Sequence, residues 1–148
     1  MGIRDWGLES SRVGPGIGGT KMQGQNFRDL HVWQLGMQLA EEVYLLSRSF
    51  PKHETYGLAS QMQRAAVSIP PNIAEGHATG STKDFLRFLG IAQGSLAELE
   101  THLMLAERIR YGNSKDVRPI LDRCSQEARM LRSLRNRVRS RVRPKQKP

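Results

Sequence analysis

The feature that most limits how this chain can fold is an apolar stripe through residues 81–112. Its members alternate steps of four and three residues: Phe85, Leu89, Ala92, Leu96, Leu99, Leu103 and Ala106. Because residues three and four apart share one face of an α-helix, the stripe predicts a long amphipathic helix with one buried side. Ser81 is a good N-cap, and Gly112 and Asn113 form a stop because both tolerate left-handed backbone.

Three further segments carry apolar residues at helical spacing. The first, residues 29–49, has two neighbouring stripes: Leu30, Trp33, Met37, Ala40 and Tyr44, beside Val32, Leu39, Val43, Leu46 and Phe50. The second opens near Glu54 and ends near residues 76–80, and its stripe is Leu58, Met62, Ala65, Ile69 and Ile73. The last follows Ser114 and fades at Pro144, and its stripe is Val117, Leu121, Cys124, Ala128, Leu131, Leu134, Val138 and Val142.

The connections between these segments are short, so neighbouring helices are expected to pack antiparallel. The sequence therefore predicts an all-α domain over residues 27–143, an antiparallel up-down-up-down four-helix bundle. Pro70 and Pro71 interrupt the second segment and predict a kink or a local break there, because a proline inside a helix lacks a donor and costs about 3 kcal/mol. Residues 1–26 contain seven glycines and predict a disordered segment, and residues 144–148 predict a disordered basic tail.

The net charge of the chain is +9, and all of it lies in the last twenty residues. Residues 129–148 contain nine basic side chains and no acidic one, so the rest of the chain is neutral overall. A field confined to one end of the fold favours a polyanion as the partner. Five arginines are spaced to share one flank of the last helix and are the candidate phosphate contacts: Arg129, Arg132, Arg135, Arg139 and Arg143.

Two interpretations of this basic end stay open. One is nucleic-acid binding through phosphate contacts, with RNA favoured over DNA. The other is a solvated helix end that aids solubility, which the mutual repulsion of nine uninterrupted cations disfavours. No aromatic residue follows Tyr111, so the segment has no stacking platform and no basis for sequence readout.

The sequence contains no pattern typical of a catalytic or metal site. Glu98 and Glu100 point about 200° apart on one helix, so they form no carboxylate pair. The four histidines lack metal-ligand spacing, and Cys124 has no second cysteine. We therefore expect a protein that is not an enzyme, with no metal, no cofactor and no small-molecule substrate.

Location is predicted from three further observations. A single cysteine fits a reducing compartment, no apolar run is long enough to span a bilayer, and the N-terminus lacks the apolar core of a secretory signal. These observations predict a cytoplasmic protein without membrane contact.

Two segments go beyond generic bundle sequence. Residues 68–76 read Ser-Ile-Pro-Pro-Asn-Ile-Ala-Glu-Gly and residues 94–101 read Gly-Ser-Leu-Ala-Glu-Leu-Glu-Thr. A structural role is expected for five members of the first: Ser68, Pro70, Asn72, Glu75 and Gly76. Ser68, Asn72 and Glu75 should hydrogen-bond the backbone groups that the prolines leave unpaired, or reach a neighbouring subunit. A catalytic role for Glu75 is the disfavoured alternative.

With Leu-His-Val-Trp at residues 30–33 and Phe-Pro at 50–51, these segments resemble the 23S rRNA intervening-sequence protein family of four-helix-bundle proteins. That family is similar in fold to the accessory proteins of diversity-generating retroelements, which form pentameric barrels and bind nucleic acid. The resemblance implies a homo-oligomer, with five subunits expected. It also keeps open an alternative function, an oligomeric scaffold that recruits a protein partner such as a reverse transcriptase.

Overall fold

The computed structural model describes residues 26–142, and every regular element within that range is helical. The elements in chain order are η1 (Phe27–Asp29), α1 (His31–Ser47), η2 (Lys52–Glu54), α2 (Leu58–Ala78), α3 (Thr82–Arg108) and α4 (Ser114–Val142). The predicted all-α fold with four long helices is confirmed. The predictions for residues 1–25, Arg143 and the tail 144–148 lie outside the described residues.

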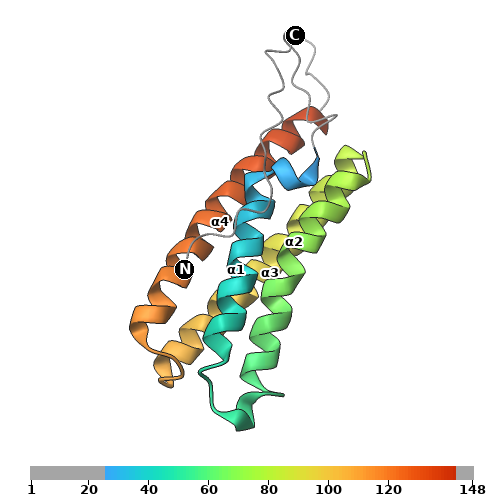
Figure 1. Cartoon of the computed structure of the whole chain (residues 1–148). Coiled ribbons are helices and arrows are strands. Elements are labelled where there is room, and N and C mark those ends of the chain that lie inside the picture. Colours follow the sequence, from blue (N-terminus) through green and yellow to red (C-terminus); the bar gives the residue numbers. More distant parts are fainter. Residues whose placement is uncertain (1–25, 143–148) are drawn as a thin grey trace.

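The four long helices lie side by side, and each runs opposite to the one before it (Figure 1). Helix α1 packs against α2 and α4, and α3 packs against the same two helices, so α1 and α3 occupy diagonal corners. The end of α4 therefore lies at the same end of the bundle as the start of α3. No helix within residues 26–142 combines the length and the apolar character needed to cross a membrane.

Helix α3 follows its predicted pattern. All seven members of its stripe are buried, and the Ser81 hydroxyl accepts a hydrogen bond from the Asp84 amide at 3.2 Å. The helix ends at Arg108, a few residues before the predicted stop. Arg110 takes a left-handed backbone at φ 62°, as does Gly112 at φ 80°, and together they turn the chain toward α4.

The two apolar stripes of α1 have different environments. The stripe that begins at Val32 faces the core, and all of its members are buried. The stripe that begins at Leu30 is only half-buried in its middle, and its last member, Tyr44, is 45% exposed. The core thus uses one stripe, and the second leaves apolar surface along the outside of α1.

Helix α4 departs from its predicted core at three positions. Leu121 and Ala128 are only half-buried, and Val142, at the end of the described helix, is 47% exposed. Ile120 and Glu127 are buried instead. The observed stripe keeps a regular alternation of three and four residues, and that spacing carries a carboxylate into the core. Leu121 and Ala128 were predicted to be buried because they are apolar, and that prediction was wrong.

Helix α2 is continuous through both prolines, from Leu58 to Ala78. The kink expected at this point stays a prediction, but the chain does not break there. Pro70 and Pro71 cannot donate to the carbonyls of Ala66 and Val67, so two helical hydrogen bonds are missing. Pro70 is buried, and its Cδ lies 3.7 Å from the position of a Cβ on Gly36, so its ring packs against α1.

Candidate nucleic-acid interface

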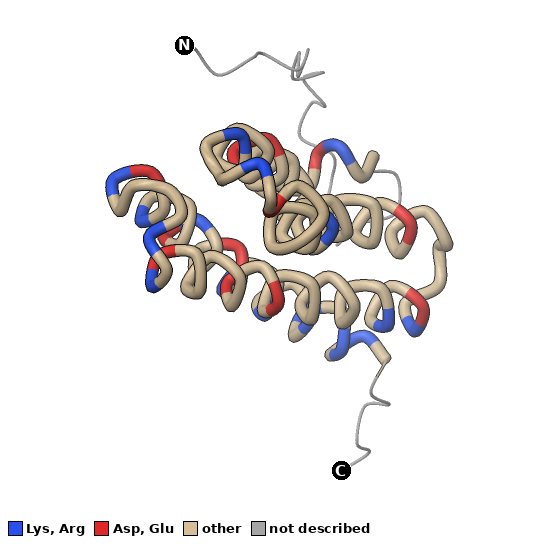
Figure 2. The backbone as a smooth tube through the Cα atoms, turned by 90° about the horizontal axis from the view of Figure 1, so that it is seen from below, with Lys and Arg blue, Asp and Glu red and all other residues tan. Residues whose placement is uncertain are grey.

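The outer flank of α4 presents exposed arginines on the side away from the core. Arg129, Arg132 and Arg139 are exposed, while Leu131 and Leu134 face inward and are buried. Figure 2 shows Lys and Arg positions along α4 up to the point where the described chain ends. The structure thus brings three of the five predicted arginines onto one open surface.

Arg135 is held inside the bundle instead. Its Nη1 donates a hydrogen bond to the side-chain oxygen of Gln93 on α3, and its Nε is buried. Its Nη2 lies 3.5 Å from the point where a Cβ on Gly90 would stand. Arg135 therefore ties α4 to α3, and its guanidinium lies in contact distance of Gly90. It is less available to a phosphate than its three exposed neighbours.

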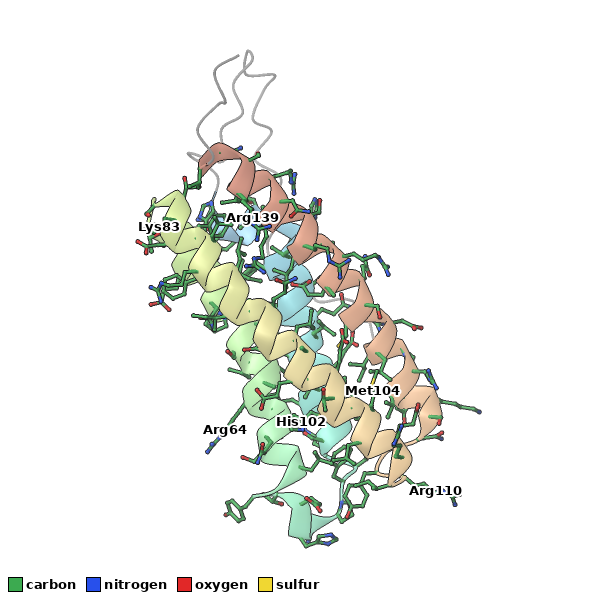
Figure 3. All side chains as sticks on the ribbon, turned by 180° about the vertical axis from the view of Figure 1, so that it is seen from behind. Arg64, Lys83, His102, Met104, Arg110 and Arg139 are labelled. Atoms are coloured by element: carbon green, nitrogen blue, oxygen red, sulfur yellow. The ribbon has the colours of Figure 1, made fainter. Side chains whose placement is uncertain are left out.

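Two basic residues missed by sequence reasoning lie at the same end of the bundle. Lys83 and Arg87 are exposed in the first turns of α3, and Figure 3 shows Lys83 at the same end as Arg139. Asp84 moderates this charge through a contact of 4.0 Å with Arg87. The antiparallel order of α3 and α4 was the available signal, because it brings the start of one helix beside the end of the other.

The motif at residues 68–76 packs α2 against α3. The hydroxyls of Ser68 and Ser95 hydrogen-bond across the two helices at 2.8 Å. The side-chain amide of Asn72 donates a hydrogen bond to the Ser68 carbonyl at 2.7 Å. Ser68 directly follows Ala66 and Val67, whose carbonyls the prolines leave unpaired. A Cβ on Gly76 would lie 2.6 Å from the Cβ of Phe88, so glycine permits this close approach.

Pro70 is buried, whereas Glu75 points outward and is exposed. The segment thus contains residues of two kinds. Ser68, Asn72 and Gly76 lie at the contact between α2 and α3, and Glu75 is exposed on the surface of the bundle.

Glu127 is the one acidic side chain in the described core, and its burial was not expected from the sequence. Both of its carboxylate oxygens are buried and have no hydrogen-bond partner among residues 26–142. Its Oε1 lies 3.7 Å from the position of a Cβ on Gly36 in α1, and Pro70 of α2 reaches the same point at 3.7 Å. Burial raises the pKa of Glu127 from 4.5 to about 8, so the neutral acid is the stable form at neutral pH.

Three carboxyl groups, Glu127 among them, lie near the Cys124 thiol. Burial, followed by the nearby carboxylates of Glu100, Glu127 and Glu42, raises the pKa of the Cys124 thiol to about 12. Burial also raises the pKa of Glu42 and of Glu100. Within residues 26–142, no group of three or more His, Cys, Asp or Glu side chains could hold a metal ion.

Comparison with known proteins identifies the family of this chain. The pattern of the 23S rRNA-intervening sequence protein family matches residues 28–133, which is most of the chain. The chain belongs to this family. The matched range covers α1, α2, α3 and most of α4, with Arg129 and Arg132, and it stops before Arg139.

A solved structure supports the fold of this family member. It is a protein of unknown function from the S23 ribosomal protein family of Bacteroides thetaiotaomicron, with 24% sequence identity and a TM-score of 0.65. The match covers 70% of this chain and 96% of that chain. No curated protein matches the chain. The similarity to retroelement accessory proteins stays a prediction.

Proposed function

We propose that this member of the 23S rRNA-intervening sequence protein family is a non-enzymatic homo-oligomer that binds nucleic acid, with RNA as the favoured class. The basic end of α4 makes the contact. The observation that carries the proposal is the exposed row Arg129, Arg132 and Arg139, opposite the buried stripe of the same helix. This row belongs to the segment that supplies the whole net charge of the chain.

The expected contact is with phosphates. Each phosphate that an arginine neutralises releases condensed counterions, so binding is tight at low salt and weakens as salt rises. Since the described end of α4 offers arginines and no aromatic surface, bases are not stacked or read there. The proposal is therefore binding that tolerates many sequences.

Self-association fits the apolar surface outside the core. Tyr44 and Leu45 of α1 are 45% and 54% exposed, and Ile91 and Met104 of α3 are 42% and 52% exposed. A closed ring of subunits would bury such side chains and would repeat the basic end around the ring. Five subunits is the number that the resemblance to retroelement accessory proteins favours. Such repetition raises overall affinity through local concentration.

A second candidate function is a scaffold that recruits a protein partner such as a reverse transcriptase. Exposed apolar residues at the end of the bundle opposite the basic end favour it, since Tyr56 is 96% exposed and Ile109 is 45% exposed. In either case we propose a cytoplasmic location.

The test replaces Arg129, Arg132 and Arg139 together with glutamine and measures RNA binding across a salt series. The slope of log affinity against log salt should fall by about 0.7 to 0.9 for each phosphate that is no longer neutralised, for every RNA sequence tried. A matched control replaces Arg48, Arg108 and Arg110 at the opposite end, which removes the same charge. Equal binding by both variants would refute phosphate contact by α4 and would favour the scaffold.

A further inference from the structure

We infer that the neutral carboxylic acid of Glu127 donates a hydrogen bond to the backbone carbonyl of Ala66, and that this proton locks α4 to α2 across the centre of the bundle. The contact depends on one proton, so the lock is closed when the carboxyl is neutral and open when it is ionised. The inference goes beyond the proposed function, because it concerns the core of a single subunit.

Two backbone carbonyls of α2 lack their helical donors. Pro70 has no N–H to bond the carbonyl of Ala66, and Pro71 has none to bond the carbonyl of Val67. The two carbonyls have different surroundings, because Val67 is 42% exposed, whereas Ala66 is 0% exposed. Water can serve the first, but a buried carbonyl needs a donor from the protein, since leaving it unpaired costs as much as a lost hydrogen bond.

The side-chain donors of this segment of α2 are already in use. The Asn72 amide donates to the Ser68 carbonyl at 2.7 Å and to the Ser68 hydroxyl at 3.0 Å. The Ser68 hydroxyl in turn pairs with the hydroxyl of Ser95 on α3 at 2.8 Å. This leaves another helix as the source of a donor for Ala66.

Glu127 reaches this point from α4, the helix diagonally opposite α2. Its Oε1 and the Cδ of Pro70 both lie 3.7 Å from the position of a Cβ on Gly36 in α1. A proline ring inside a helix lies against the carbonyl four positions earlier, which here belongs to Ala66. The carboxyl and the unpaired carbonyl therefore face the same small region of the core.

The two groups complement each other only when the carboxyl is neutral. Both oxygens of Glu127 are buried and have no hydrogen-bond partner among residues 26–142. An ionised carboxylate only accepts hydrogen bonds and would repel the carbonyl oxygen of Ala66, whereas the neutral acid carries one O–H donor. One hydrogen bond then satisfies two buried polar groups, which explains how this core tolerates both a carboxyl and a proline.

The charged groups around Glu127 do not oppose its neutral form. Glu42 of α1 and Glu100 of α3 lie near the Cys124 thiol, about one turn from Glu127 on α4. The cation at this level, Arg123, is paired with Glu42 at 3.1 Å. Burial raises the pKa of Glu127 to about 8. The lock is therefore closed at neutral pH and opens as pH rises above about 8.

A double-mutant cycle tests the hydrogen bond. Glu127→Met removes the donor and keeps the size of the side chain, and Pro70→Ala returns a backbone N–H that can bond the Ala66 carbonyl in place of the carboxyl. In urea unfolding at pH 6 and fixed protein concentration, Glu127→Met should lower the folding constant about tenfold more in the wild-type background than in the Pro70→Ala background. The matched control is Pro71→Ala, which serves the exposed carbonyl of Val67 and should show no coupling to Glu127→Met.

Infrared spectroscopy separates a hydrogen bond from a packing contact. The carbonyl stretch of a neutral carboxylic acid is distinct from that of a carboxylate, and the Glu127 band is assigned by its absence from Glu127→Gln. Wild type should show this band at pH 6, and Pro70→Ala should move it to higher frequency, because the acid then loses its acceptor. The band should disappear as pH rises through about 8.

The possible results decide for or against the lock. Absence of coupling at Pro70, or equal coupling at both prolines, would overturn it. Coupling without a shift of the infrared band would show a packing contact alone and would also overturn it. Wild type without the acid band at pH 6 would show an ionised Glu127, which decides against the lock even if a variant fails to fold. None of these measurements involves RNA or the number of subunits, so the proposed function is tested separately.

Discussion

Glu127→Gln is the perturbation for which the structure gives the clearest expectation. Glutamine has nearly the shape of a neutral glutamic acid, so it keeps the packing beside Gly36 and removes the ionisation. The pKa of Glu127 is raised from 4.5 to about 8 by burial. Each pKa unit corresponds to about 1.4 kcal/mol, so the penalty for ionising Glu127 in the folded protein is about 5 kcal/mol. That is a large share of the stability of a domain.

The sign follows from proton binding in the two states. Between pH 4.5 and about 8 the unfolded chain has lost the Glu127 proton and the folded protein still holds it. The free energy of unfolding therefore falls as pH rises through this window and is constant in this respect above it. Glu42 and Glu100 contribute in the same direction, since burial raises the pKa of each. These contributions are common to wild type and variant and cancel in the difference.

The assay is urea unfolding of wild type and Glu127→Gln at fixed protein concentration, from pH 5 to pH 8. The two proteins should have similar stability at pH 5. At pH 8 the variant should be more stable by about 4 kcal/mol, because the folded-state carboxyl is then half ionised and the full value of about 5 kcal/mol is reached only at higher pH. The measurements stay below a pH of about 8.5, the ordinary pKa of a cysteine thiol, so that Cys124 keeps most of its protons in the unfolded chain as well as in the folded protein. Parallel stability profiles would refute the assignment of a neutral, buried Glu127.

Three other substitutions test the packing of two glycines and the role of Arg135. Gly76→Ala brings a Cβ to 2.6 Å from Phe88 and should destabilise the subunit by about 1–3 kcal/mol in urea unfolding. Gly94→Ala meets open space and should stabilise it by about 0.5–1 kcal/mol, so equal effects at the two glycines would contradict the packing. Arg135→Gln removes the hydrogen bond to Gln93 and should lower the melting temperature while leaving the salt slope of RNA binding nearly unchanged. A slope reduced as much as in the exposed-arginine variant would show that Arg135 contacts phosphate.

The helices could be predicted from the sequence because their periodicity and their packing agree. In α3 the apolar stripe, the Ser81 cap and the buried face all coincide, so each signal supports the others. In α4 they conflict at one position. A regular spacing points to residue 127, but a carboxylate there argues against burial, and the outcome depends on its contacts with Gly36 of α1 and with α2. Those contacts involve three helices and are not visible in any one segment.

The candidate interface was predictable in its charge and not in its details. The arginine spacing gives the exposed row on α4, since the opposite side of that helix is apolar. The same spacing cannot separate Arg135 from Arg139. Their difference comes from Gln93 and Gly90, which α3 brings to one of them and not to the other. Long-range contacts of this kind follow from the bundle geometry.

The proposed ring of subunits and its basic ends act against each other in the absence of RNA. In a closed ring all subunits point the same way, so the exposed arginines of α4 lie on one side of the assembly and repel one another. Replacing Arg129, Arg132 and Arg139 with glutamine should therefore strengthen self-association of the free protein, while it weakens RNA binding. In an antiparallel assembly the basic ends are far apart, and the same variant should associate like wild type. Sedimentation of both proteins at low salt measures the difference. RNA that neutralises the basic ends relieves the same repulsion, so binding and assembly should reinforce each other by linkage.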